Sequence, residues 1–444
     1  MSEQPLLWID GFDDYDLVNQ GQSYYQSCNL SPMKGRSGTG AQGFATKTFS
    51  EGEQASLSMG FAYMLTDPSG TPTNLFQFGQ SYSDFNFIVG LYGDDATATA
   101  AVSGVGGTTI TVTITHGGSY YGTPPKVTIV NHVAGGSYTS ATAAVAGGSV
   151  TSITVTGASG YDPAHPPSVE IAPGGRGFRA STNMNGITNT TTDTPSSNYI
   201  LPNKWYYLEL QATVASVFDL FTGLSYASTT YVLRVNGSTW LSSTLASNEN
   251  VLPSLTDFNF AKALFNTGGQ GIFDDLYISA GELLPDLYFQ NGNNGIRVKT
   301  LKPNGVGANT GFTPNVPGAD NWTMVKDVIP DDDVTTVEST QALDGFGSPI
   351  QDTYNMEDLP TSVTDIFGVQ ANVYVRKDKA GPGSLDVLRS DNSGGVFVLI
   401  TDEPSYNVSP VKRFRFISKA LRNDFGVDWT VGQINNIQIG MRKS

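Results

Sequence analysis

The chain has 444 residues, of which 39% are hydrophobic and 11% aromatic, a composition too apolar for a disordered protein. Only 14% are charged, and 40 acidic against 24 basic side chains give a net charge of −16, which disfavours binding to nucleic acid or to an anionic membrane. A single cysteine, Cys28, excludes an intrachain disulfide, and no segment resembles a signal peptide or a transmembrane helix. We therefore expect a protein made in a reducing cytosol, without membrane insertion.

The frequent turn residues predict many short strands. There are 50 Gly and 23 Pro, and the segments between them are rich in Tyr, Phe, Val, Ile and Thr. Long runs of Ala, Leu, Glu, Lys and Arg, which would favour helices, are missing. The sequence therefore predicts an all-β protein.

In chain order, the first predicted domain is split and comprises residues 1–93 and 177–282. Apolar and polar residues alternate along several of its segments, as in half-buried strands. Asn236-Gly237 lies between two apolar runs and predicts a tight hairpin turn. The predicted strands include Ser56–Tyr63, Phe85–Tyr92, Trp205–Leu210, Thr230–Val235 and Gly271–Ile278.

Residues 94–176 contain an internal repeat of about 43 residues. Gly-rich polar segments flank it, which is typical of a small domain inserted between two strands of a host domain. We expect each repeat to hold about three strands, and the two repeats to pack together. The matching segments are Ala98–Val102 with Ala141–Val145, Ile110–Thr113 with Ile153–Thr156, and Pro124–Ile129 with Pro166–Ile171.

The third predicted domain is a β-sandwich of residues 283–444. No segment of disordered composition separates it from the first domain, so we expect the two to pack together. Its last segment, Thr430–Gly440, predicts a short turn or helix that leads into a final strand. Further strands are expected at Ile296–Leu301, Ile366–Arg376, Gly395–Ile400 and Val411–Ile417, with a turn at Pro303–Gly305.

Several motifs resemble known protein families. Ile9–Asp13 and Phe273–Ile278 resemble the first and last strands of a concanavalin A-like jelly roll, and Ser159-Gly160-Tyr161 resembles a turn in Gly-rich β units of phage tail proteins. The first repeat departs from that turn, with Ser119-Tyr120-Tyr121. The third domain resembles a family of tailed-bacteriophage virion proteins through Val298–Gly305, Asn321-Trp322, Pro330–Asp333, Asp358–Pro360 and Gly368–Asp378.

These resemblances imply a structural and adhesive component of a tailed-phage virion, made in the host cytoplasm and placed in a tail fibre or baseplate. A capsid-surface fibre or decoration protein, a polysaccharide-degrading virion enzyme and a monomeric sugar-binding module stay as alternatives. The expected partners are other virion proteins, further copies of the chain in a trimer, and a host surface glycan or protein. No cofactor is expected.

The sequence offers no convincing catalytic group, so we expect a protein that is not an enzyme. His116, His132 and His165 all lie beside turns of the inserted repeats, where we interpret them as surface residues rather than as bases of a catalytic triad. Glu51 and Glu53 could form a carboxylate pair of the glycosidase type, but their segment reads as a solvated loop.

Acidic and aromatic residues are the candidates for metal and sugar sites. Asp13-Asp14 and Asp331–Asp333 could bind Ca²⁺ but lack the residue spacing of an EF-hand loop. Asp274-Asp275 is interpreted as a pair that hydrogen-bonds a loop. Tyr24-Tyr25 and Tyr120-Tyr121 are expected at the surface, where they could touch a glycan. Trp8, Trp205, Trp240, Trp322 and Trp429 are expected in or beside strands, mostly as core residues. No catalytic, cofactor or metal residue is assigned, and the ligand-binding residues stay unknown.

Overall fold

The computed structural model describes residues 6–12, 27–36, 39–49, 53–67, 74–79, 86–184, 187–195, 197–219, 224–246, 259–267, 270–281, 296–327, 334–341, 343–375, 384–390, 398–399, 406–407, 414–417 and 429–443. Within these ranges the helical elements are a 3₁₀ turn, η2 (Asn321–Met324), and one short helix, α2 (Val431–Ile434). The prediction of an all-β protein is therefore confirmed. No helix of the described residues is long and apolar enough to cross a membrane.

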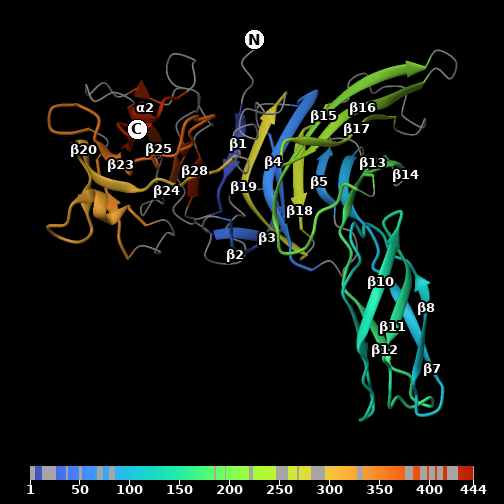
Figure 1. Ribbon diagram of the computed structural model, residues 1–444. Coiled ribbons are helices and arrows are strands. Elements are labelled where there is room, and N and C mark those ends of the chain that lie inside the picture. The colour runs from blue at the N-terminus through green and yellow to red at the C-terminus, as the bar shows by residue number, and fades with distance from the viewer. Residues whose placement is uncertain are drawn as a thin grey trace.

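Figure 1 shows a central β-sandwich, which we call the body, with an arm of long hairpins below it and a third region at its other side. The body contains the sheet order β14-β13-β6-β5-β18-β3-β19-β4-β15-β16-β17, with β1 added on β19 and β2 on β3. Its strands are β1 (Leu6–Asp10), β2 (Ser27–Lys34), β3 (Thr39–Thr48), β4 (Ser56–Leu65), β5 (Asn74–Gly79), β6 (Asn86–Tyr92), β13 (Gly177–Met184), β14 (Ile187–Asp193), β15 (Trp205–Asp219), β16 (Leu224–Val235), β17 (Ser238–Ala246), β18 (Lys262–Asn266) and β19 (Gly271–Ala280).

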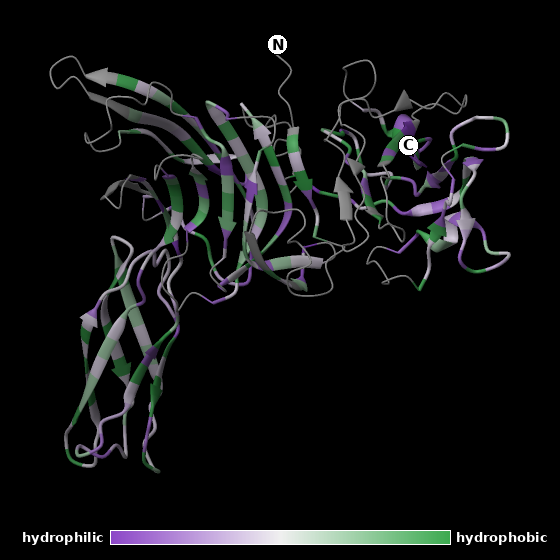
Figure 2. Cartoon of the chain, turned by 180° about the vertical axis from the view of Figure 1, so that it is seen from behind, coloured by the Kyte–Doolittle hydropathy of each residue, from purple (hydrophilic) through white to green (hydrophobic). Residues whose placement is uncertain are grey.

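This sheet folds over itself because strands of its two halves bury aromatic side chains against each other. Phe61 of β4 stacks on Phe76 of β5 at 4.6 Å between ring centroids. Phe87 of β6 meets Tyr231 of β16 at 5.0 Å. Alternate residues of β4 belong to this core, as the period of two in the sequence requires. Figure 2 shows green, hydrophobic segments along the strands of the body. Each fully buried Phe contributes roughly 1.5–3 kcal/mol of burial free energy.

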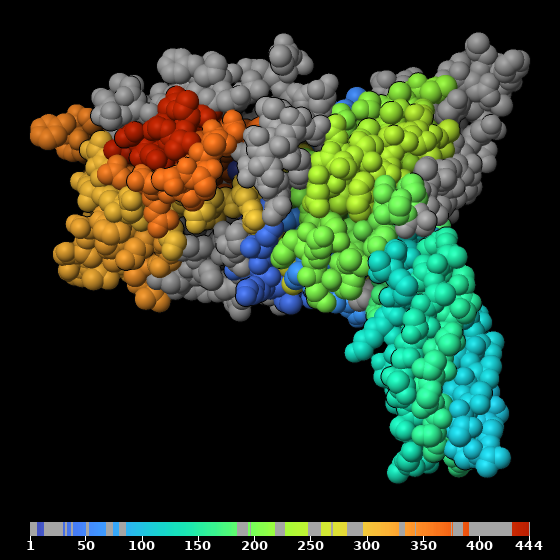
Figure 3. All heavy atoms as spheres, in the orientation of Figure 1, coloured from blue at the N-terminus to red at the C-terminus, as the bar shows by residue number. Residues whose placement is uncertain are grey.

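The arm comprises residues 94–176 and leaves the body between the neighbouring strands β6 and β13. Its three two-stranded ladders enclose a core of their own, which holds the equivalent residues Ile110 and Ile153 of the two repeats. In Figure 3 it projects as a closely packed rod. The strands are β7 (Thr97–Ser103), β8 (Thr109–His116), β9 (Val127–Val130), β10 (Ser140–Ala146), β11 (Ser149–Thr156) and β12 (Ser168–Ile171).

The two repeats of the arm are related by an internal two-fold. Their equivalent strands β9 and β12 pair antiparallel, with Val127 opposite Ile171 and Ile129 opposite Val169. Because Val127 corresponds to Val169 and Ile129 to Ile171, exchanging the repeats leaves this pairing unchanged. The loop of one repeat that faces the body is thus equivalent to the loop of the other repeat at the far end.

The turn that differs between the repeats explains how the arm is attached. The middle residue of this turn has a positive φ in both repeats, 74° at Gly160 and 59° at Tyr120. Tyr120 therefore adopts a backbone conformation that favours glycine. Its ring is buried against Tyr92 of β6, with centroids 6.4 Å apart, and its hydroxyl donates to the Thr194 carbonyl at 3.3 Å. The departure from the repeat pattern places an anchor in the body.

The third region contains a sheet in the order β20-β23-β29-β25-β26, with β27 added on β25, and the shorter pairs β21–β22 and β24–β28. The predicted short turn or helix before a final strand is confirmed, as the helix α2 followed by β29. The strands are β20 (Pro303–Thr310), β21 (Thr313–Pro314), β22 (Val337–Glu338), β23 (Gln351–Met356), β24 (Asn372–Val375), β25 (Ser384–Ser390), β26 (Val398–Leu399), β27 (Tyr406–Asn407), β28 (Phe414–Ile417) and β29 (Gln438–Lys443).

One predicted strand of this region is wrong. Residues 296–302 form no strand, and the turn predicted at Pro303–Gly305 is instead the start of β20. The backbone groups of residues 296–298 bond to side chains of the body, so they do not need a partner strand. The Ile296 carbonyl accepts from Arg36, and the Val298 amide donates to Asp275 at 2.7 Å. The packing of the third region on the body, expected from the sequence, is confirmed by these contacts.

Candidate functional site

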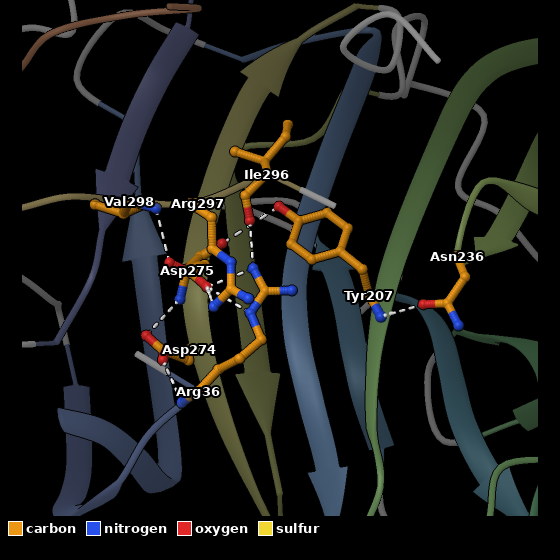
Figure 4. Close-up of polar contacts among 8 residues, drawn as sticks. All are labelled: Arg36, Tyr207, Asn236, Asp274, Asp275, Ile296, Arg297 and Val298. Carbon is orange, nitrogen blue, oxygen red and sulfur yellow. Dashed lines mark hydrogen bonds and ion pairs between the residues drawn. The ribbon is translucent and has the colours of Figure 1, made fainter. Parts of the chain in front are cut away.

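The described residues form two polar arrangements, and the first is buried. It surrounds Asp274 and Asp275, in the middle of β19 (Figure 4). The Arg36 side chain donates from Nε and Nη2 to Asp275 Oδ2 at 2.9 and 2.6 Å, and the Arg36 amide donates to Asp274 Oδ2 at 2.7 Å. Asp275 has a φ of 54°, and the ladder between β19 and β4 is irregular at this point.

This buried cluster is structural rather than a substrate site. The exposed fraction of the side chain is 0% for Asp275 and 6% for Arg36, so neither can reach a ligand in solution. Burial, then the negative charges of Glu209 and Asp275, raises the pKa of Tyr207 well above its ordinary value, which keeps its hydroxyl protonated. That hydroxyl donates to the Asp275 carbonyl at 3.3 Å. The interpretation of Asp274-Asp275 as a pair that hydrogen-bonds a loop is confirmed.

The second arrangement is open to solvent and lies in the third region. A cavity of about 530 Å³ lies at the start of β20, beside η2 and the end of β23. This volume falls within the range of roughly 300–1,000 Å³ that is usual for small-ligand sites. We call it the Trp322 pocket; its lining residues are Lys302, Pro303, Asn304, Trp322, Lys326, Asp327 and Glu357.

A buried polar network holds the 3₁₀ turn that carries Trp322. Asn321 donates from Nδ2 to the Phe312 carbonyl and to Asp352 Oδ2, both at 2.8 Å. Tyr354 donates its hydroxyl proton to the same Asp352 oxygen at 2.6 Å. Asp352 lies on β23 in the sheet beneath, so the turn and its indole are fixed to a rigid element. A site on rigid elements loses little freedom when a ligand binds.

This network predicts a pH dependence of stability. Burial raises the pKa of the Asp352 carboxyl, although the hydrogen bonds from Tyr354 and Asn321 act in the opposite direction. The folded state therefore binds this proton more tightly than the unfolded state, and stability falls as the pH rises from about 3.9, the ordinary value, through the raised pKa.

Asp352→Asn should remove the loss of folding stability that accompanies the rise in pH. We expect the difference in unfolding free energy between the Asp352→Asn variant and the wild type to shift in favour of the variant as the pH rises, by about 1.4 kcal/mol for each pH unit between the two pKa values. Urea unfolding at a series of pH values measures this difference. A difference that stays constant from acid to neutral pH would contradict the prediction.

The charged residues of the Trp322 pocket have defined partners. The Lys302 amide donates to Glu357 Oε2 at 3.3 Å, and the Glu357 amide donates to the Lys302 carbonyl at 2.9 Å. Thr335 donates its hydroxyl to Asp327 Oδ2 at 3.2 Å. The Lys326 ammonium lies 5.5 Å from the centroid of the Trp322 ring. The residues that line the opening thus include one indole, two lysines, two acidic residues and one asparagine.

Such a set of groups suits binding of a polyhydroxyl compound. A sugar presents an apolar C–H face that can pack on an indole, and hydroxyls that both donate and accept hydrogen bonds. No group of three or more His, Cys, Asp or Glu residues able to hold an ion occurs in the part of the chain that the structure describes.

The residues singled out from the sequence have varied positions. His116, His132 and His165 are exposed on the arm, as predicted, and His165 Nδ1 lies 2.7 Å from Asp162 Oδ2, which lowers the pKa of that carboxyl. Glu53 is exposed, and Glu51 lies outside the described residues. Asp13-Asp14, Tyr24-Tyr25 and Asp331–Asp333 also lie outside them.

Two expectations about aromatic residues are corrected. Tyr120 and Tyr121 were expected at the surface, but they are 5% and 4% exposed because both pack at the base of the arm. Trp8, Trp205, Trp240 and Trp429 pack on cores, as expected. Trp322 differs from the expected core position: it is partly exposed and lies in a 3₁₀ turn that packs beside β20.

The sequence interpretation missed the remaining residues of the Trp322 pocket, and one signal could have found them. Lys302 to Asn304 lie in the segment Val298–Gly305, Trp322 lies in Asn321-Trp322, and Glu357 directly precedes Asp358–Pro360. All three segments carried the resemblance to phage virion proteins. They are far apart in the sequence, and the fold brings them to one opening.

Comparisons with known proteins add little to this geometry. No protein-family model matches the chain, and no curated protein matches it in sequence. Among solved structures, a mutant of alginate lyase Aly36B in complex with an alginate tetrasaccharide matches at 9% identity and a TM-score of 0.30, over 64% of this chain and 100% of the lyase. A second alginate lyase Aly36B structure matches at 9% identity and a TM-score of 0.29, over 62% and 97%. A structure of botulinum neurotoxin type C, whose cell entry depends on interaction with two ganglioside molecules, matches at 10% identity and a TM-score of 0.26. The match covers 96% of this chain and 97% of the neurotoxin chain.

The lyases nevertheless correct one expectation. The sequence predicts a protein without enzymatic activity, whereas two of the matching solved structures are alginate lyases. The exclusion of enzymes is therefore wrong as stated. At these identities and TM-scores the matches carry no argument for a particular reaction in this chain.

Proposed function

We propose that this chain is an attachment protein of a tailed-phage particle, which contacts carbohydrate on the host surface through the Trp322 pocket. The observation that carries the proposal is the open pocket itself, in which an indole faces donors and acceptors of hydrogen bonds. Two of the five segments that resemble phage virion proteins, Val298–Gly305 and Asn321-Trp322, contribute residues to this pocket, and a third begins directly after Glu357. Tail fibre or baseplate is the proposed location, with the capsid surface as the alternative.

The architecture supports the same proposal. The body is a rigid sandwich, the arm projects from one side of it, and the third region with the pocket lies on the other (Figure 1). A single contact with one sugar is expected to be weak, because the free energy that it gains must first offset the freedom lost on binding. We propose that three copies of the chain act together, because several weak contacts held in one particle bind far more firmly than one.

The proposal predicts that Trp322→Ala weakens binding to host surface polysaccharide by about tenfold or more, because the variant loses the apolar wall of the pocket. Phe346→Ala is the matched control: Phe346 is an aromatic residue of the same region, is 97% exposed and does not line the pocket. Binding is measured by retention of the purified protein on immobilised polysaccharide, and folding is checked by the thermal midpoint.

Equal binding by both variants and the wild type would contradict the role of the pocket. The same incubation is assayed for released oligosaccharide, because an enzymatic role is open. Imaging the phage particle with an antibody against the arm would separate a tail location from the capsid surface.

A further inference from the structure

The charges that line the Trp322 pocket cancel. Lys302 and Lys326 contribute two positive charges, and Asp327 and Glu357 contribute two negative ones. The pocket therefore offers no net attraction to an ion of either sign. Over longer distances the chain carries a net charge of −16, and this field lowers the local concentration of anionic ligands.

Each carboxylate of the pocket uses one oxygen within the protein. Glu357 Oε2 accepts from the Lys302 amide, and Asp327 Oδ2 accepts from Thr335. The second oxygen of each carboxylate has no hydrogen-bond partner among the residues that the structure describes. A carboxylate oxygen only accepts, so it is suited to a ligand that brings hydroxyl donors. A ligand that carries a carboxylate of its own would be repelled by the negative charges of Glu357 and Asp327.

The lysine beside the indole completes this arrangement. The Lys326 ammonium lies over the Trp322 ring, at 5.5 Å from its centroid, where the ring already attracts it. This ammonium can accept no hydrogen bond but can donate to a sugar oxygen. The pocket thus supplies both kinds of partner that hydroxyl groups need, without excess positive charge.

We infer that the Trp322 pocket selects a neutral sugar residue over an acidic one. This inference rests on the proposed carbohydrate function and adds the class of sugar. One sugar ring stacks on Trp322, its hydroxyls donate to Glu357 and Asp327, and its oxygens accept from the lysines. A uronic acid, which differs from a hexose by a carboxylate at C6, binds more weakly.

The test compares sugars that differ only in this charge. The full-length protein is titrated with methyl glucoside against methyl glucuronide, and with methyl galactoside against methyl galacturonide, followed by ligand-observed NMR. We expect the neutral member of at least one pair to bind about fivefold more tightly or better, since a like charge within about 4 Å costs on this order even in water. Trp322→Ala should abolish binding, and Phe346→Ala should leave it unchanged.

A second variant checks the cause. Glu357→Gln removes one negative charge and keeps an oxygen that can accept from the Lys302 amide, so it should narrow the gap between the neutral and the acidic sugar by about threefold. Tighter binding of the uronides, or of alginate oligosaccharide, would overturn the inference and leave the carbohydrate function standing. Absence of binding to every neutral and acidic sugar tested would overturn both.

Discussion

Arg36→Ala is expected to lower the free energy of unfolding by about 3–5 kcal/mol, because it leaves a buried carboxylate without its main counter-charge. Asp275 is fully buried and receives two hydrogen bonds from Arg36. Arg297 is the nearest remaining cation, with Nη1 at 3.8 Å from Asp275 Oδ2, but 45% of its side chain is exposed. Its partial compensation places the expected loss toward the lower end of the range.

The third region provides a matched control for this prediction. Arg442 donates from Nε and Nη2 to Asp386 Oδ2 at 3.0 and 2.9 Å, the same two bonds that Arg36 makes. The Arg442 side chain is 31% exposed, against 6% for Arg36, so Arg442→Ala opens a path for water to Asp386, although the Asp386 side chain is itself only 6% exposed. The loss for Arg442→Ala should therefore be smaller than for Arg36→Ala, about 1–3 kcal/mol.

Urea unfolding followed by tryptophan fluorescence measures both variants. The double variant Arg36→Ala with Asp275→Asn should recover part of the stability, because no buried charge remains. Equal losses for Arg36→Ala and Arg442→Ala would show that burial of the pair does not determine its contribution.

Tyr120→Ala is expected to weaken the attachment of the arm by about 3 kcal/mol, since it deletes a buried aromatic side chain. The loss should be local. The amides of Arg176 and Ile200, which bond to each other's carbonyls at 2.9 and 2.8 Å beside the arm base, should exchange with solvent about 100-fold faster. The amides in the β9–β12 ladder, inside the arm, should keep their protection.

Tyr120→Gly separates the anchor from the backbone strain. At a φ of 59°, glycine avoids a cost of roughly 1–2 kcal/mol that alanine still carries. The glycine variant should therefore be the more stable of the two, although both lack the ring. Unchanged exchange at Arg176 and Ile200 in both variants would mean that Tyr120 is not the anchor.

Much of the fold followed from local patterns. In β4, β15 and β19 the side chains alternate between the core of the body and the other face of the sheet, which other residues cover. Asn236-Gly237 has the positive φ values of 49° and 77° that its hairpin turn needs. The repeat of the arm could be found because each unit keeps its own spacing of strands and turns. These features depend on neighbours in the sequence.

The rest depends on contacts between distant residues. Residues 296–302 alternate like a strand, but side chains of Arg36 and Asp275 take their backbone hydrogen bonds. Tyr120 looked like a surface residue because nothing in its own repeat shows that Tyr92 and Thr194 lie beside it. The Trp322 pocket combines segments that are far apart in the sequence, with Lys302 and Glu357 separated by 55 positions. The bounds of the three domains and the assembly of the chain into a trimer stay predictions.

The way the arm joins the body also has a mechanical consequence. The arm is continuous with β6 and β13, which pair with each other and leave the sheet at the same end, where Tyr92 lies opposite Gly177. A pull on the arm along these strands draws both in the same direction, so their mutual ladder carries little load. The load passes instead to the β5–β6 and β13–β14 ladders. There the pull runs along the strands and therefore perpendicular to the hydrogen bonds, so it shears each ladder. All the bonds of a ladder must then fail together rather than one by one, which makes this junction suited to bearing tension.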